Sequence, residues 1–445
     1  MKSWMRVFAL APLFAVLLLG CGEDSGSGPV EPTPARDAAA SLPVSETAMR
    51  TEIKLPERAP ASEMPLSLPP DHWLVGTSDV ADMYPATIAP PAPRQLLAEY
   101  GPAYIEQIGE NRVLHLKGSH YDMGYQHGTL VKDEIVEAAA LIRAIGSIEW
   151  NKDFDASIQE AWTRLSPYIP EKYKEEMKGV ADATGMTLEQ VQEFTIFPEL
   201  FHCSGFALWG KATQDGSLLH GRVLDYMRDA GLDKWALLII QEPEGANAFV
   251  NVAYSGMLGS VTGMNAEQIA IGEMGGGGAE KWDGMPMSLL LRECLEEADT
   301  LEDAQRIMSE TPRTCQYYYV ISDAKANGGL GHAVGVAAEP GGIVFIGPNE
   351  FHDQLPRPFE DAVLLSAGGR YTCLADRVEK MYGQFTPQIA LDLMARGVSM
   401  KSNMHNALFK PRTLELWVSN STVEQPSCNR LYAHYSFRSL LNTRP

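Results

Sequence analysis

Basic residues are scarce in this chain of 445 residues: 36 Lys and Arg stand against 57 Asp and Glu, giving a formal net charge of −21. This balance argues against nucleic acid as a partner, because phosphates need a basic surface. It also disfavours electrostatic docking on anionic lipid. Hydrophobic residues make up 45% and charged residues 21%. These proportions are typical of a globular protein and exclude disorder along the whole chain.

Several catalytic motifs are missing. His120 and His127 are the closest approach to a His-Glu-x-x-His zinc motif, and their spacing does not fit it. No Gly-x-Ser-x-Gly elbow occurs, which disfavours an α/β-hydrolase. The glycine run 275–278 lacks the Lys-Ser/Thr of a phosphate-binding loop, and no dinucleotide fingerprint is present. We therefore expect neither a metal ion nor a cofactor.

The chain has one long apolar run, Val7 to Leu19, which follows Lys2 and Arg6. It is too short to span a bilayer, and it has the charged start and apolar middle of a secretory signal. The run leads into Leu-Leu-Gly-Cys at positions 18–21, which resembles the lipobox of bacterial lipoproteins. The resemblance implies cleavage after residue 20, lipidation of Cys21 and an exported lipoprotein of the cell envelope. Its only membrane contact would then be the anchor. The alternative is an ordinary signal in which Cys21 is incidental.

Residues 21–95 are rich in Pro, Ala, Ser and Gly. Such a segment cannot bury enough apolar surface to offset its ordering entropy, so it is predicted to be a disordered tether. Residues 96–202 are predicted to be mainly helical, because apolar residues recur at helical spacing around 130–145 and again around 170–183.

Residues 203–445 change to strand patterns interrupted by helices. Three hairpins are predicted, at 206–224 around Asp215-Gly216, at 235–254 and at 317–336. Helical periodicity returns at 289–298, 304–309, 371–382 and 387–395. Strands among helix pairs indicate an α+β fold, with antiparallel sheets covered by helices.

Six cysteines occur, and removing Cys21 as an anchor leaves an odd number: Cys203, Cys294, Cys315, Cys373 and Cys428. An odd cysteine in an exported protein can be a free, reactive thiol, with the other four forming two disulfides. The alternative is that all five are buried thiols.

The hairpin around Asp215-Gly216 is the most informative stretch for chemistry. It folds Arg222 and Asp225 back toward Cys203, at the start of the first strand. A thiol needs a nearby positive charge to ionise at neutral pH, and Arg222 can supply one. Asp225 can hold an ammonium group or orient a proton carrier. The alternative is a structural hairpin with an ordinary Arg–Asp surface pair.

Seven blocks of sequence carry a resemblance to a known family. Cys203-Ser204, a Thr-x-Asp-Gly turn and Gly-Arg-x-x-Asp at 221–225 are similar to the opening of cysteine N-terminal-nucleophile hydrolases, which include penicillin V acylase and choloylglycine hydrolase. The other blocks resemble the acyl-coenzyme A:6-aminopenicillanic-acid acyltransferase family. They lie at 116–128, 175–182, 263–265, 319–323, 369–371 and 400–411.

The resemblance implies a four-layer αββα sandwich preceded by a helical pro-segment. It also implies that the precursor cuts itself between His202 and Cys203, which separates residues 21–202 from a catalytic part, 203–445. The free α-amine of Cys203 then serves as base for its own thiol, which attacks an amide carbonyl. Asp225 matches the residue that binds this amine, and Arg222 and Arg370 match arginines of the site.

Three departures concern the oxyanion donors. Val223 replaces the usual Asn of the Gly-Arg-Asn-x-Asp turn, Gly275 stands where bile acid hydrolases have an Asn, and Thr314 stands near a second one. A backbone N–H at Gly275 can substitute. Asn265 and Asn403 are the alternative donors.

These features predict a self-cleaving hydrolase or acyltransferase that acts on the amide bond of a small N-acyl compound. A choloylglycine- or ceramidase-like amidase of the same fold is the second reading. A third is a lipid-anchored binding protein on a degenerate hydrolase scaffold, motivated by the missing Asn residues. The sequence leaves the acyl group, the amine and the oligomeric state open.

Overall fold

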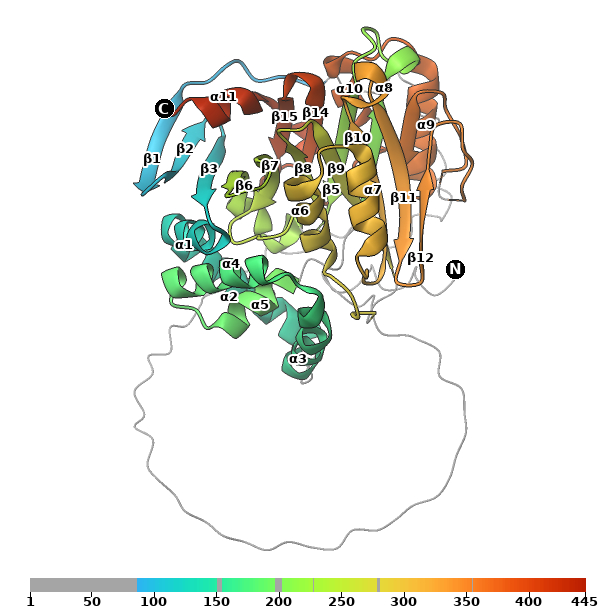
Figure 1. Ribbon diagram of the computed structural model, residues 1–445. Coiled ribbons are helices and arrows are strands. Elements are labelled where there is room, and N and C mark those ends of the chain that lie inside the picture. Colours follow the sequence, from blue (N-terminus) through green and yellow to red (C-terminus); the bar gives the residue numbers. More distant parts are fainter. Residues whose placement is uncertain (1–85, 150–153, 197–201, 227, 278–280, 354) are drawn as a thin grey trace, which may run out of the picture. The chain divides into compact units, whose positions relative to one another are not determined.

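The computed structural model describes residues 86–149, 154–196, 202–226, 228–277, 281–353 and 355–445 (Figure 1). The predicted signal peptide, Cys21 and the tether up to residue 85 lie outside these residues. Among the described residues, no helix combines the length and apolar character needed to cross a membrane.

Two sheets form the centre of the protein. The ten-stranded sheet has the order β1-β2-β3-β6-β7-β8-β9-β10-β11-β12. Its strands are β1 Arg94–Tyr100, β2 Ala103–Ile108, β3 Asn111–Gly118, β6 Ala236–Pro243, β7 Phe249–Tyr254, β8 Thr262–Asn265, β9 Ile269–Gly277, β10 Gln316–Asp323, β11 His332–Glu339 and β12 Gly342–Ile346. The six-stranded sheet has the order β13-β4-β5-β14-β15-β16. Its strands are β4 His202–Leu208, β5 Leu219–Asp225, β13 Ala362–Leu365, β14 Asn403–Lys410, β15 Glu415–Asn420 and β16 Ala433–Ser436.

The three predicted hairpins are confirmed as β4–β5, β6–β7 and β10–β11, each antiparallel. The turn of the first contains Gly216 at φ 74°, a conformation that glycine adopts without steric cost. This turn sets the register that places Cys203 opposite Leu224, and thereby brings Asp225 to the same end of the hairpin.

The prediction that residues 96–202 are mainly helical is wrong for its first part, because β1, β2 and β3 occupy 94–118. The strand β3 pairs in parallel with β6, with Val113 opposite Leu238. The stretch Val113–Leu116 is apolar apart from His115, and so short a stretch cannot distinguish strand from helix. A partner strand more than a hundred residues further along the chain decides the conformation.

The predicted tether is too long at its C-terminal end. Ile88 forms a parallel bridge with Tyr432, and the backbone N–H of Ala89 donates to the Tyr432 carbonyl at 2.8 Å. Residues 86–95 therefore pack against the folded part, and the strand β1 already begins at Arg94.

Helices follow β3. They are α1 His120–Leu130, α2 Lys132–Glu149, α3 Phe154–Leu165, α4 Glu171–Thr184 and α5 Leu188–Ile196. The helix predicted near 170–183 is confirmed as α4, which Gly185 ends in a left-handed conformation. Close packing of α1 on α4 depends on Gly124 and Gly179, because a Cβ at either would overlap backbone atoms of the other helix.

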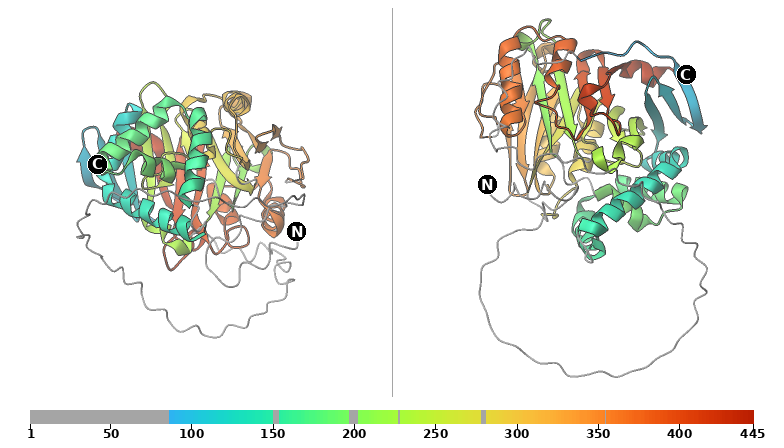
Figure 2. Two further views of the ribbon diagram at one scale, coloured as in Figure 1. Left: turned by 90° about the horizontal axis from the view of Figure 1, so that it is seen from below. Right: turned by 180° about the vertical axis from the view of Figure 1, so that it is seen from behind.

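The remaining helices cover the outer faces of both sheets. The ten-stranded sheet carries α6 Met287–Glu297 and α7 Leu301–Glu310, and the six-stranded sheet carries α9 Gly368–Met381 and α10 Pro387–Leu393. Both helix pairs are visible in Figure 1, and the view from behind in Figure 2 shows α9 on the side away from α6 and α7. The strands β4 and β5 pack on β9 across the interior. The predicted α+β class and its four-layer αββα arrangement are confirmed.

Buried histidines link the two sheets. His220 of β5 lies 2.7 Å from the Ser322 hydroxyl of β10, and His405 of β14 lies 2.9 Å from the Thr262 hydroxyl of β8. Burial lowers the pKa of His220 to about 3 and the pKa of His405 well below its usual range. Both imidazoles are therefore neutral in the folded protein at neutral pH.

The five cysteines of the described residues are free thiols, so the alternative with two disulfides is wrong. Cys203, Cys294, Cys315 and Cys373 are buried, and Cys428 is partly exposed. Burial agrees with the alternative in which cysteine acts as a small apolar residue.

Replacement of Gly124 by Ala should destabilise the protein, because the new Cβ would lie 2.1 Å from the Glu176 carbonyl oxygen. We expect a loss of about 1–3 kcal/mol, the usual cost of overpacking. Urea unfolding followed by circular dichroism measures it. Gly341→Ala is the control, since nothing lies within 4 Å of a Cβ there. Equal stability of the two variants would contradict the close packing of α1 on α4.

Stability should fall as the pH drops below about 6.5. His220 and His405 then bind protons in the unfolded chain, whereas burial keeps their pKa low and leaves them neutral in the folded protein. Each histidine contributes about 1.4 kcal/mol per pH unit between its unfolded and folded pKa values. Urea midpoints at pH 7.5 and 5.5 test this. The drop should shrink by about 1 kcal/mol in His220→Gln relative to the wild-type protein. The same pH dependence in the variant and the wild type would disprove the assignment.

Candidate active site

Cys203 is the second residue of β4, and its side chain faces the interior between the sheets. It lies opposite Leu224 of β5, and both belong to the apolar cluster between the two sheets. Cys203 is only 3% exposed. His202, the other residue of the predicted cleavage site, pairs through its backbone with Asp225. The predicted cut therefore falls within a paired strand, next to Asp225.

Arg370 brings three of the predicted residues together. Its Nη1 lies 2.6 Å from Oδ2 of Asp225, and its Nη2 donates to the Cys203 carbonyl at 3.4 Å. The second carboxylate oxygen of Asp225 accepts from the backbone N–H of Met400 at 2.9 Å. Asp225 is buried, and burial raises its pKa while Arg370 opposes the rise. The pair thus fixes a carboxylate beside the start of the catalytic segment.

Arg222 is buried with a partner that the sequence analysis did not identify. Its Nη2 lies 3.2 Å from Oε2 of Glu273 in β9, and both side chains are fully buried. Burial raises the pKa of the Cys203 thiol to about 12; Arg222 lowers it, whereas Glu273 and Asp225 raise it further. In the uncut chain the thiol is therefore protonated at neutral pH, because the Glu273 carboxylate offsets the positive charge of Arg222. Glu273 is a lone charge in the apolar strand β9, and that pattern is the signal that could have identified it.

Two predicted oxyanion donors are occupied elsewhere, so these predictions are wrong for the uncut chain. The Asn265 amide donates to the carbonyls of Leu295 and Ala298 at the end of α6. The Asn403 amide donates to the Leu224 carbonyl at 3.0 Å and to Asn406 at 2.9 Å, and its oxygen accepts from the backbone N–H of Cys428. Both side chains complete hydrogen bonds that buried polar groups require.

The assignment of Gly275 and Thr314 as oxyanion donors stays a prediction. Gly275 lies in β9 opposite Tyr317, in the strand that packs on β4. Thr314 is buried in the connection between α7 and β10. Their side chains differ from the Asn of bile acid hydrolases, so any oxyanion contact from Gly275 would come from its backbone N–H.

A cavity of about 70 Å³ is lined by Leu224 of β5, the residue that pairs with Cys203, although Cys203 itself is not among its lining residues. Its walls come from both predicted parts of the chain. Helices α2 and α5 contribute Ala138, Ile142, Phe194 and Thr195, and the remaining walls are Leu224, Tyr226, Leu232, Trp235, Tyr254, Ser255, Met257, Leu258, Gly259, Val261 and Met404. Most of these side chains are apolar, so the cavity suits an apolar group.

Substitution of Arg370 by Met should destabilise the protein by about 3 kcal/mol, because it leaves the Asp225 carboxylate buried without a cation. Urea unfolding at pH 7.5 measures this. Arg357→Met is the control. Arg357 pairs at the surface with Asp376 and Glu379 of α9, the helix that also carries Arg370, and such pairs contribute about 0–1 kcal/mol. Equal losses in the two variants would show that the Asp225 pair has no special role.

Comparison with known proteins gives one family match. Residues 213–334 match the model of the acyl-coenzyme A:6-aminopenicillanic acid acyl-transferase family. The chain is 24% identical over 357 residues to Protein dcd1B of Dictyostelium discoideum, covering 71% of this chain and 69% of that protein. It is 26% identical over 198 residues to the acid ceramidase of Homo sapiens, covering 39% of this chain. The matched part spans 49% of that ceramidase, about half its length.

Solved structures give distant likenesses. An N-acylethanolamine-hydrolyzing acid amidase ortholog of Caenorhabditis elegans aligns with a TM-score of 0.37 and 14% identity, covering 47% of this chain and 93% of that one. Penicillin V acylase from Agrobacterium tumefaciens aligns with a TM-score of 0.34 and 11% identity, covering 49% and 83%. The match over residues 213–334 confirms the predicted resemblance to the acyl-coenzyme A:6-aminopenicillanic-acid acyltransferase family.

Proposed function

We propose that the protein is an amide hydrolase or acyltransferase that acts on carbon–nitrogen bonds, with Cys203 as its nucleophile. The family match and the similarity to acid ceramidases support an activity on amides in general. The observation that carries the finer proposal is the bridge from Arg370 to the Asp225 carboxylate and the Cys203 carbonyl. It gathers three residues that are far apart in the sequence at the start of one strand.

The first step is a cut of the chain's own backbone. The Cys203 sulfur attacks the carbonyl carbon of His202, a C–S bond forms, and the C–N bond to Cys203 breaks as the nitrogen takes up a proton. Water then hydrolyses this thioester, releasing the His202 carboxylate and the thiol. The new α-amine of Cys203 has an ordinary pKa of about 7.7–8.0, so it exchanges protons near neutrality.

The same sulfur is then the nucleophile that attacks the substrate. The α-amine takes the thiol proton, the sulfur attacks the amide carbonyl, and the leaving amine carries the proton away. Water or a second amine attacks the resulting acyl-thioester and frees the sulfur. Asp225 is placed to hold the α-ammonium, because its backbone pairs with His202 at the cut and Arg370 and Met400 fix its carboxylate.

The cut also changes the electrostatics of the thiol. In the continuous chain, burial and the Glu273 carboxylate keep the pKa of Cys203 high, which protects the thiol from ionising. An ammonium on the same residue adds a positive charge next to the sulfur, and a nearby cation lowers a thiol pKa. We therefore expect the cut to make the thiol easier to ionise.

We infer an apolar acyl group, because the cavity lined by Leu224, the strand partner of Cys203, has mainly apolar walls. A choloylglycine- or ceramidase-like amidase is the second reading, with a bulky apolar acyl group or amine. Beyond the described residues, we propose that Cys21 is lipidated and holds the protein at the cell envelope of a bacterium.

Intact mass spectrometry of the purified protein tests the self-cleavage. We expect two fragments that separate before Cys203, and one continuous chain in Cys203→Ala. The control is Cys428→Ser, which removes the only partly exposed thiol of the described residues and should still be cut.

Hydrolysis of N-acyl amides should fall by roughly 10³-fold or more in Cys203→Ala, since the nucleophile is lost. In the cut protein, a thiol-alkylating reagent should label Cys203 ahead of Cys428. An uncut wild-type chain that leaves acyl amides intact would instead favour a binding protein on a degenerate scaffold.

A further inference from the structure

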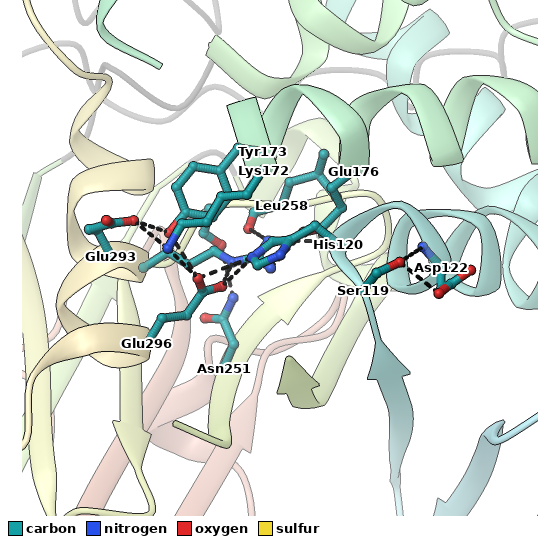
Figure 3. Close-up of polar contacts among 12 residues, drawn as sticks. Ser119, His120, Asp122, Lys172, Tyr173, Glu176, Asn251, Leu258, Glu293 and Glu296 are labelled. Carbon is teal, nitrogen blue, oxygen red and sulfur yellow. Dashed lines mark hydrogen bonds and ion pairs between the residues drawn. The ribbon is translucent and has the colours of Figure 1, made fainter. Parts of the chain in front are cut away.

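A fully buried arginine joins the helical segment to the wall of the cavity. Arg292 lies in α6 and is 0% exposed. Its Nη2 lies 2.6 Å from Oε2 of Glu176 in α4, and its Nε lies 2.7 Å from Oε1 of Glu296 in α6. Its Nη1 donates to the carbonyl of Leu258 at 2.7 Å. Figure 3 shows Glu176, Leu258 and Glu296 converging from three separate elements.

Side chains from both predicted parts of the chain complete this cluster. Lys172 of α4 places its amino group 2.9 Å from Glu293, 3.0 Å from Glu296 and 2.7 Å from Glu297. His120, from the block at 116–128, lies 3.1 Å from Glu296. The three glutamates could be mistaken for a cation site, but Lys172 already occupies the space between them. The cluster instead binds α1 and α4 to α6 through charge pairs.

Leu258 belongs to the loop that forms one wall of the cavity. Met257, Leu258 and Gly259 all line it, together with Leu224, the strand partner of Cys203. Gly256 has φ 85° and lies between the lining residues Ser255 and Met257. The conformation of such a loop depends on the groups that hold its backbone.

One of those groups belongs to the helical segment, and a second is oriented by a residue of that segment. His127 of α1 accepts from the backbone N–H of Gly256 at 2.9 Å. Arg292, whose guanidinium Glu176 orients, holds the Leu258 carbonyl two residues later. From within the sheet, Asn251 donates to the Gly259 carbonyl at 2.8 Å. After the predicted cut at residue 202, these contacts act together with the pairing of β3 and β6 to join the two fragments.

We propose that Arg292 is a positioning residue: it couples Glu176 of the helical segment to the Leu258 carbonyl and so fixes the cavity wall that receives the acyl group. That the cavity receives an acyl group rests on the proposed function, whereas the coupling of Glu176 to the Leu258 carbonyl does not. Arg292 acts through Leu258 and has no role in the bond-making steps. Its effect is on which acyl groups fit beside Cys203.

Hydrogen–deuterium exchange of the full-length protein tests the structural part. Arg292→Lys keeps the charge but loses the planar fork that reaches Glu176 and the Leu258 carbonyl together. We expect amides in 255–260 to exchange roughly tenfold faster. Glu176→Gln, a milder change, should produce the same local effect. The matched control is Arg377→Lys, another buried arginine, which donates to the carbonyls of Leu393 and Arg396 on the far side of the six-stranded sheet. It should leave 255–260 unchanged.

Hydrolysis of N-acyl amides of one amine, with acyl chains from two to twelve carbons, tests the positioning. In Arg292→Lys, kcat/KM should fall roughly tenfold for long chains, mainly through KM, and less than about threefold for the shortest. If Arg292 only stabilised the fold, kcat/KM would fall by the same factor for every chain length. Unchanged exchange in 255–260, or the same increase in Arg377→Lys, would overturn the inference. An uncut and inactive wild-type protein would overturn the proposed function. The exchange data would still show whether Arg292 holds the loop 255–260 in place.

Discussion

A buried carboxylate needs partners, and Asp225 has two: Arg370 at the start of α9 and the backbone N–H of Met400 before β14. The backbone of Asp225 pairs with His202 at the start of β4. The free energy of an unpaired charge in this place would be prohibitive. The ion pair therefore fixes where β4 begins relative to α9, and with it the position of Cys203. The rest of the site is organised around this start of a strand.

The interior between the sheets has an unusual share of polar groups. Arg222 and Glu273 face each other across it, and His220 and His405 link strands of opposite sheets. Each has a polar partner on the other sheet, and such directional contacts fix how the two sheets are positioned more specifically than apolar packing alone. The thiol of Cys203 lies in this interior, and its strand partner Leu224 lines the cavity. Its high pKa in the continuous chain follows from that burial.

Local patterns predicted much of this fold. The three hairpins, the helices α4, α6, α7, α9 and α10, and the convergence of Cys203, Asp225 and Arg370 followed from turn residues, periodicity and the motif resemblance. The strands at 94–118 did not, because β3 is a strand only by pairing with β6, far along the chain. Glu273 was missed because its partner Arg222 lies on another sheet. Asn265 and Asn403 were wrongly offered as oxyanion donors, since a sequence does not show which amides are already hydrogen-bonded.

The central claim is that the Cys203 sulfur carries the acyl group. Rapid acid quenching of the cut protein with an excess of an N-acyl amide, followed by peptide mapping by mass spectrometry, tests it most directly. The account predicts that the acyl mass appears on the peptide that begins with Cys203 and is removed by hydroxylamine, as a thioester is. Acyl groups on another residue, or turnover with no covalent adduct at Cys203, would contradict it.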